Sequence, residues 1–374
     1  MAGIYIHIPF CKQKCTYCDF HFSTTFEVYR SEMIETICQE IKLRTSELGG
    51  EIIKSIYFGG GTPSILNEVE LLAILKQIKE VLNVHSEAEI TLEANPDDVT
   101  IEDLSTWKKA GINRLSIGIQ SFKAEDLRWM NRAHTVEEAE NAVLLAQKAG
   151  FQNITVDLIY GLPNLSLSEW KSHVEKVIAM GVQHISAYCL TIEEKTALNK
   201  LVKEQKIIPA NEDQQSDQFE LLIDVLETAG FEQYEISNFA RDKHYAVHNT
   251  NYWTGQTYLG VGPSAHSFDG KSRRWNVSNN RQYMTSMGKD SSWFTSELLS
   301  DKEQWNELIM TGLRTTFGVS LEQLKAIHSL TPSFEVKLAE FKAYGWMEDS
   351  PTLLRLTKEG KLKADYIASE LFLD

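Results

Sequence analysis

Three cysteines with the spacing of metal ligands stand near the start of the chain. Cys11, Cys15 and Cys18 form the pattern Cys-x-x-x-Cys-x-x-Cys directly after a short apolar run. Thiolates commonly bind zinc or iron–sulfur clusters. A structural zinc site needs four protein ligands, and only His7 and His21 are close enough in sequence to add a fourth. The trio favours an iron–sulfur cluster with one open iron, with zinc or packed core cysteines as alternatives.

A glycine-rich segment follows the second apolar run. It reads Gly59-Gly60-Gly61-Thr62-Pro63. Glycine lets a backbone approach a ligand closely and leaves its N–H and C=O groups accessible. A P-loop is excluded because no Gly-Lys-Ser/Thr sequence follows. The segment therefore predicts either a cofactor contact or a plain turn between a strand and a helix.

Polar side chains occur at or near the ends of three later apolar runs. These residues are Glu93, Gln120 and Asp157. A buried polar group without a partner costs about 1–3 kcal/mol, so each needs a ligand or a structural hydrogen bond. One such residue is easily a helix cap or a hydrogen-bond anchor. Three in successive strands predict a ligand site at their common edge.

A histidine and aromatic motif occurs two-thirds of the way along the chain. It runs His248-Asn249-Thr250-Asn251-Tyr252-Trp253. Neutral imidazole is a common metal ligand, and Tyr252 and Trp253 offer flat apolar faces to a planar ligand. The alternative is that His248 bonds a loop while the aromatic side chains fill the core.

Alternating strand and helix patterns surround these residues and must position them. The predicted strands are Ile4–Ile8, Ile53–Phe58, Glu89–Glu93, Arg114–Ile119, Thr155–Tyr160 and Gln183–Tyr188. The predicted helices are Val28–Leu48, Glu68–Leu82, Ile101–Lys109, Val136–Ala149, Leu167–Met180 and Glu212–Ala229. Gly150, Gly181 and Gly230 follow three of these helices, where left-handed C-caps are expected. Repeated βα units predict a parallel sheet, either open or an incomplete (β/α) barrel, with ligands at the carboxyl ends of its strands.

The 374 residues divide into three predicted parts. Residues 1–230 form the α/β part, and residues 231–295 form a loop-rich extension that carries the histidine motif. Residues 296–374 form a small helical or winged-helix-like domain, with a short strand at Leu353–Leu356 and a closing helix at Lys361–Leu373.

Composition excludes several classes of protein. The net charge of −15 argues against general binding to nucleic acid, which needs clustered basic residues. No apolar run approaches the ~18 residues of a membrane span, and the first residues lack the features of a signal peptide. Five cysteines in a chain of this length do not make a disulfide framework. A cytoplasmic location is expected. Cys38 falls on an apolar helix stripe and is predicted to be a core residue.

The segment Tyr5-x-His7-Ile8-Pro9-Phe10-Cys11-x-x-x-Cys15-x-Tyr17-Cys18 resembles the opening of radical S-adenosylmethionine (SAM) enzymes. It is most similar to the branch that contains oxygen-independent coproporphyrinogen III oxidases and their haem-chaperone relatives. The resemblance extends to at least His266. It implies a partial (β/α)6 barrel and a [4Fe–4S] cluster on the three cysteines. The open iron of that cluster would bind S-adenosylmethionine, which the superfamily cleaves reductively to a 5′-deoxyadenosyl radical.

The resemblance also implies a set of residues that contact S-adenosylmethionine. By position they are Tyr5, Tyr17, Gly60, Gly61, Thr62, Glu93, Gln120, Arg132 and Asp157. Arg132 enters the set through the resemblance alone, because an isolated arginine is usually a surface residue. Cys189 follows the sixth strand and is expected at most to line the site. The related oxidases carry an apolar, cofactor-contacting residue where His266 stands.

Two departures from the oxidases favour the chaperone branch. Phe20 stands where the oxidases have a further cysteine, and the chain begins four residues before Tyr5 whereas the oxidases carry an N-terminal extension. The histidine motif is a signature of the chaperone branch. The resemblance makes His248, Tyr252 and Trp253 the candidate haem site, in which neutral imidazole suits the iron and the aromatic faces suit a porphyrin, and which atom would bind iron stays open. The resemblance therefore implies a protein that binds haem and delivers it to respiratory haem proteins, with membrane contact only through such clients. The alternative is oxidative decarboxylation of coproporphyrinogen III, and a zinc-stabilised binding module ranks third. Enzymatic activity and formation of a homodimer stay open.

Overall fold

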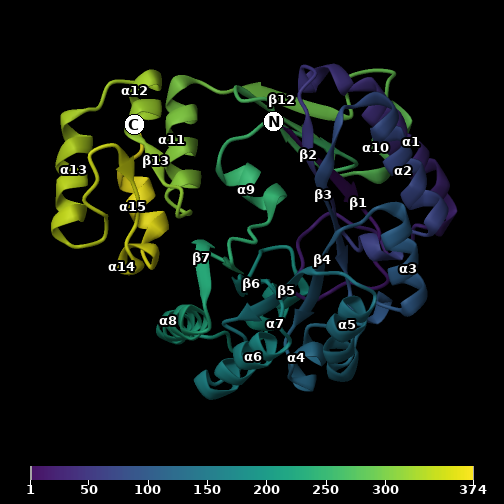
Figure 1. Ribbon diagram of the computed structural model, residues 1–374, viewed down its shortest axis with the longest axis horizontal. Helices are drawn as coiled ribbons and strands as arrows, with labels where there is room; N and C mark the ends of the chain where they lie inside the picture. Colours follow the sequence, from purple (N-terminus) through teal and green to yellow (C-terminus); the bar gives the residue numbers. More distant parts are fainter. Residues whose placement is uncertain (1, 374) are drawn as a thin grey trace.

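The computed structural model describes residues 2–373, and its centre is one large curved sheet (Figure 1). Six strands pair in parallel in the order of the chain. They are β1 (Ala2–Ile8), β2 (Ile53–Gly60), β3 (Val84–Ala94), β4 (Arg114–Gln120), β5 (Asn153–Tyr160) and β6 (His184–Cys189). All six lie where the apolar runs predict strands. The parallel order confirms the α/β prediction and brings the carboxyl ends of the strands to one rim.

Amphipathic helices cover the outer face of these strands (Figure 1). The main ones are α1 (Arg30–Leu43), α2 (Glu68–Val81), α3 (Ile101–Ala110), α5 (Val136–Lys148), α6 (Leu167–Ala179) and α8 (Glu212–Thr228). The shorter α4 (Ala124–Trp129) and α7 (Ala197–Lys203) lie in the connections. The helix predicted over Val28–Leu48 ends at Leu43, and a 3-10 turn, Thr45–Leu48, follows it. Gly150, Gly181 and Gly230 have φ angles of 87°, 72° and 84°, so these left-handed C-caps are confirmed.

The segment predicted to be loop-rich adds strands to both ends of the sheet. Its elements are β7 (Phe231–Glu235), β8 (Asn238–Arg241), α9 (Val247–Trp253), β9 (Tyr258–Val261), β10 (His266–Phe268), β11 (Ser272–Asn276) and α10 (Asn280–Ser286), and β12 (Phe294–Leu298) follows. The sheet runs β12-β11-β10-β9-β1-β2-β3-β4-β5-β6-β8-β7, and its end strands are not paired with each other. The barrel is therefore partial. These strands hold only three to five residues each, too few to show a periodic pattern.

A small helical domain follows the sheet and has its own core (Figure 1). Its elements are α11 (Asp301–Gly312), β13 (Val319–Ser320), α12 (Leu321–Ile327), α13 (Pro332–Ala343), β14 (Leu353–Leu354), α14 (Lys358–Lys361) and α15 (Ala364–Glu370). The closing helix predicted over Lys361–Leu373 is α15, and the short α14 ends at the first residue of that range. Within residues 2–373, no helix combines the length and apolar character needed to cross a membrane. The three-part division of the chain at residues 230 and 295 stays a prediction.

Candidate functional site

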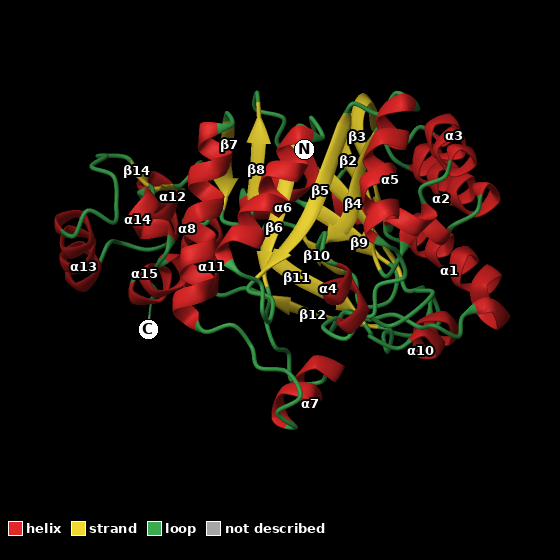
Figure 2. Ribbon diagram, turned by 90° about the horizontal axis from the view of Figure 1, so that it is seen from below, coloured by secondary structure: helices red, strands yellow, loops and turns green. Residues whose placement is uncertain are grey.

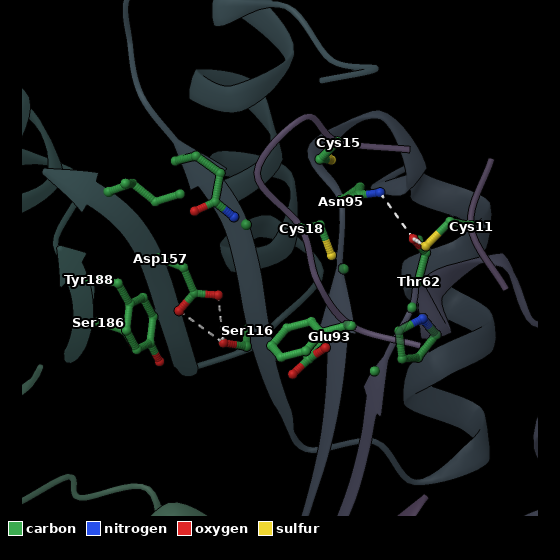
Figure 3. Close-up of a pocket in the computed structure, with 18 of the residues that line it drawn as sticks. Cys11, Cys15, Cys18, Thr62, Glu93, Asn95, Ser116, Asp157, Ser186 and Tyr188 are labelled. Carbon is green, nitrogen blue, oxygen red and sulfur yellow. Dashed lines mark hydrogen bonds between the residues drawn. The ribbon is translucent and has the colours of Figure 1, made fainter. Parts of the chain in front are cut away.

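A cavity of about 640 Å³ occupies the interior of the partial barrel (Figure 3). Residues from every strand between β1 and β6 line it, together with the cysteine loop and α9. The lining includes every residue named from the sequence for the cluster and S-adenosylmethionine: Tyr5, Cys11, Cys15, Tyr17, Cys18, Gly60, Gly61, Thr62, Glu93, Gln120, Arg132 and Asp157. The structure thus brings together residues that span some 150 positions of the chain. A volume of this size is typical of a small-molecule site.

The cysteine loop lies across the carboxyl ends of β1 and β2. Cys11 is 9% exposed, and its sulfur accepts a hydrogen bond of 3.4 Å from the Thr62 hydroxyl. The sulfur of Cys15 lies 3.5 Å from a guanidinium nitrogen of Arg132, which donates to it. Cys18 points into the same cavity (Figure 3). Each thiol therefore borders the space in which a cluster would be held.

The chemistry of this loop suits a polynuclear cluster. Burial, together with the neighbouring thiols, raises the pKa of Cys11 to about 12 and that of Cys18 to about 11. Thiolates at these positions thus require a cationic partner. Among residues 2–373, no three His, Cys, Asp or Glu side chains converge closely enough to hold a single metal ion. Three thiols spread around a wider space fit a cluster, in which each thiolate binds a different iron.

The glycine-rich turn holds the cysteine loop in place. The amides of Gly61 and Thr62 donate to the carbonyl oxygens of Ile8 and Phe10, at 2.9 and 2.7 Å. Gly60 has a φ of 102°, a left-handed conformation that favours glycine. A Cβ at Gly61 would collide with the Phe10 carbonyl. The same segment can therefore serve both as the turn between strand and helix and as a close backbone contact to a ligand.

Two carboxyl groups face each other across the cavity, Glu93 from β3 and Asp157 from β5 (Figure 3). Tyr57 donates a hydrogen bond of 2.8 Å to Glu93, and Ser116 donates to Asp157 at 3.1 Å. Burial raises the pKa of Glu93 to about 7, and the nearby Asp157 adds to the shift. Burial likewise raises the pKa of Asp157 to about 6. A ligand that carries positive charge would stabilise both carboxylates.

Arg132 connects the cysteine loop to the strand ends. Its guanidinium donates to the side-chain oxygen of Asn95 at 2.7 Å and to the carbonyl of Gly118 at 2.9 Å. Its Nε atom is buried and has no hydrogen-bond partner, so one donor is unused beside the cavity. Gln120 has a φ of 68° at a register shift between β4 and β5. A left-handed non-glycine residue is strained, and such strain often occurs at functional positions.

The histidine motif forms the floor of the cavity. His248 is 2% exposed, and its ring nitrogens hydrogen-bond to the hydroxyls of Ser55 and Tyr252, at 2.8 and 3.0 Å. The indole N–H of Trp253 donates to Asn249, and Arg314 of the helical domain lies 5.3 Å from the Trp253 ring. His248 and Tyr252 line the cavity, whereas Trp253 contacts the helical domain. The three residues therefore do not share one face, and His248 would have to release a hydrogen bond to bind iron.

Several cavity residues have no signal in the sequence. Tyr57 and Ser116 look like ordinary strand residues, and Asn95 looks like the start of a turn. Only the alternation of side chains along paired strands indicates that these residues lie on the same face of the sheet as Glu93 and Asp157. Cys189 lines the cavity, as expected, and Cys38 packs against the main hydrophobic core.

Comparison with known proteins first defines the structural class to which this chain belongs. The Radical SAM superfamily is matched over residues 5–177, and the HemN C-terminal domain over residues 299–362. The structure of coproporphyrinogen III oxidase (HemN) from Escherichia coli superimposes with a TM-score of 0.85 at 22% identity. The match covers 99% of this chain and 90% of that chain. The protein therefore has a radical SAM barrel with a HemN-type C-terminal domain.

Sequence relatives identify the family within that class. The chain is 33% identical to heme chaperone HemW of Bacillus subtilis (strain 168), over 97% of each chain. It is 36% identical to heme chaperone HemW of Escherichia coli (strain K12), over 71% of this chain and 69% of that protein. The chain belongs to the HemW family of the radical SAM superfamily. Membership of this superfamily implies a [4Fe–4S] cluster and S-adenosylmethionine.

Proposed function

We propose that this protein is a haem chaperone, which binds haem and delivers it to respiratory haem proteins. The proposal is supported by membership of the HemW family, whose curated relatives carry that name over nearly the full length of the chain. The single structural observation that carries it is the cavity, which unites the cysteine loop with the polar strand ends.

Within this function, Cys11, Cys15 and Cys18 hold the [4Fe–4S] cluster. The S-adenosylmethionine residues are Tyr5, Tyr17, Gly60, Gly61, Thr62, Glu93, Gln120, Arg132 and Asp157. When bound, the cluster supplies a reducing electron and an open iron position. The Glu93 and Asp157 carboxylates attract the positive charge of the ligand, and their hydroxyl donors fix their orientation. Thr62 donates to the sulfur of Cys11 and so favours its thiolate form, and Arg132 donates to the sulfur of Cys15.

Haem is the cargo in this proposal, and the acceptors are haem proteins of the respiratory chain. Contact with a membrane occurs through these clients. The sequence prediction that His248, Tyr252 and Trp253 form the haem site stays a prediction, and the formation of a homodimer stays open. The buried position of His248 means that haem binding there requires a local rearrangement of α9.

A paired assay tests the proposal. Cluster-loaded protein is titrated with haemin, and the haem complex is then mixed with an apo-cytochrome, whose absorption reports transfer. The expected result is saturable binding near one haem per chain, followed by transfer to the acceptor. The same preparation is incubated anaerobically with reductant, S-adenosylmethionine and coproporphyrinogen III, and no protoporphyrinogen IX is expected. Absence of saturable haem binding contradicts the proposal.

The second candidate function is that of an anaerobic coproporphyrinogen III oxidase. The observation that favours it is the cavity, which is lined by every residue that the resemblance to the oxidases assigns to the cluster and S-adenosylmethionine. Against it stands Phe20, which is 66% exposed at the cavity where the resemblance places a further cysteine in the oxidases. Formation of protoporphyrinogen IX in the assay above would select this candidate.

A further inference from the structure

One of the ten histidines has an accessible imidazole that the protein leaves unused. All ten lie within residues 2–373, and eight of them hydrogen-bond through a ring nitrogen. The two exceptions are His173 and His266. His173 is 6% exposed and packs beside Phe122 and Trp170. His266 is exposed, so among residues 2–373 it is the exposed histidine for which neither ring nitrogen makes a hydrogen bond.

His266 lies close to the wall of the cavity. It is the first residue of β10, next to β9 and β11 in the sheet (Figure 2). Its backbone packs directly on Gly260 of β9, where a Cβ would collide with the His266 carbonyl. Gly260 pairs with Tyr5 of β1, and Tyr5 lines the cavity. A ligand on His266 therefore sits beside the wall of the site proposed for the cluster and its cofactor.

The strands that carry His266 are firmly anchored from one side. The neighbouring Ser267 accepts a hydrogen bond of 2.8 Å from the buried Arg44. On β11, Asn276 donates to the buried Glu40 at 2.8 Å. Side chains alternate along a strand, so His266 and its pairing partner Trp275 project from the opposite face. This is the arrangement of a preorganised site on rigid elements.

The surroundings of His266 suit a large flat anion. The Trp275 ring lies nearly parallel to the imidazole, with centroids 6.1 Å apart and planes 21° apart. Phe268 and Arg273 follow on the same face as a cross-strand pair. Arg273 is paired with Glu307, but a guanidinium has five donors and can also bind a carboxylate. Partial burial and the nearby Arg273 lower the pKa of His266, which favours the neutral, iron-binding imidazole.

We propose that His266 is the axial ligand of haem in this chain, with Trp275 as the apolar contact and Arg273 as the partner of a haem carboxylate. This inference rests on the proposed haem-chaperone function and specifies its haem site. It replaces His248, whose two ring nitrogens are already hydrogen-bonded in the cavity floor.

Haemin titration of full-length, cluster-loaded variants tests the site. His266→Ala should lose the spectrum of histidine-ligated haem and bind haemin at least tenfold more weakly. Added imidazole should restore that spectrum, because it can occupy the space left by the side chain. His85→Ala is the matched control, since His85 is also exposed but lies at the start of β3. It should titrate like the wild type.

The outcomes separate this inference from the function on which it rests. Wild-type protein that binds no haem overturns both. Wild-type binding that is unchanged in His266→Ala overturns the site and leaves the function standing. Loss of the histidine-ligated spectrum in His248→Gln, with retention in His266→Ala, also overturns it and returns the ligand to the histidine motif.

Discussion

Replacement of Glu93 by glutamine should weaken binding of S-adenosylmethionine without loss of the cluster. Glutamine keeps the shape of the side chain and can still accept the 2.8 Å hydrogen bond from Tyr57, but it removes the negative charge. A hydrogen bond to a charged group contributes about 1.5–3 kcal/mol, which corresponds to roughly 10- to 150-fold in affinity. Calorimetric titration of anaerobic, cluster-loaded protein measures this change. Glu87→Gln is the matched control, because Glu87 lies on the same strand and is exposed.

The pH dependence of the same titration tests the cause of the effect. Burial raises the pKa of Glu93 to about 7, so this carboxyl is largely neutral below pH 7 and charged above it. Affinity in the wild type should therefore rise between pH 6 and pH 8. In Glu93→Gln that rise should flatten, leaving a weaker dependence near pH 6 that belongs to Asp157. Equal affinity of variant and wild type at pH 8, with the same pH profile, would refute the placement of the cofactor against Glu93.

Three further substitutions test other parts of the site. Replacing Cys11, Cys15 and Cys18 by alanine should abolish labile sulfide and the roughly four irons per chain that are expected after reconstitution. The control Cys38→Ala should retain both. Stoichiometric zinc without labile sulfide in anaerobically purified wild-type protein would contradict this prediction. Arg132→Lys should lower the affinity for S-adenosylmethionine about tenfold in calorimetry, because lysine cannot contact Cys15, Asn95 and Gly118 together. Unchanged affinity would show that Arg132 has only a structural role. His248→Ala should reduce the free energy of unfolding by about 2–5 kcal/mol in urea titrations, since it leaves a void and removes a hydrogen-bond partner from the hydroxyls of Ser55 and Tyr252. A change below about 0.5 kcal/mol would show that the cavity floor tolerates its loss.

The fold was predictable where long patterns exist and not where elements are short. The six central strands each contain a run of β-branched or other apolar residues. Each is followed by a helix of at least ten residues, after the short α4 in the case of β4 and the short α7 in the case of β6, so each such unit carries two independent signals. The strands β7 to β12 carry neither signal. Their pairing depends on the edges that β1 and β6 expose, which is a tertiary property.

The cavity residues also divide into those that the sequence alone reveals and those that it does not. Glu93 and Asp157 stand out because a carboxylate in a buried strand is uncommon. Tyr57 does not, because tyrosine is a normal strand residue and only the curvature of the sheet directs its hydroxyl to Glu93. Arg132 was placed through family resemblance, and its contacts with Asn95 and Gly118 supply the physical reason.

The role of the histidine motif bears on how haem-binding data should be interpreted. Glu89 accepts hydrogen bonds from the amides of Val247 and His248 at 3.0 Å, and so ties the start of α9 to β3. At its other end α9 contacts the helical domain through Trp253 and Arg314. A substitution at His248 therefore disturbs the cavity floor and its link to the helical domain at once. Weaker haem binding in such a variant is expected from either role. Only a readout that reports the iron ligand itself, such as the absorption spectrum with imidazole rescue, distinguishes loss of a ligand from loss of the surface that supports it.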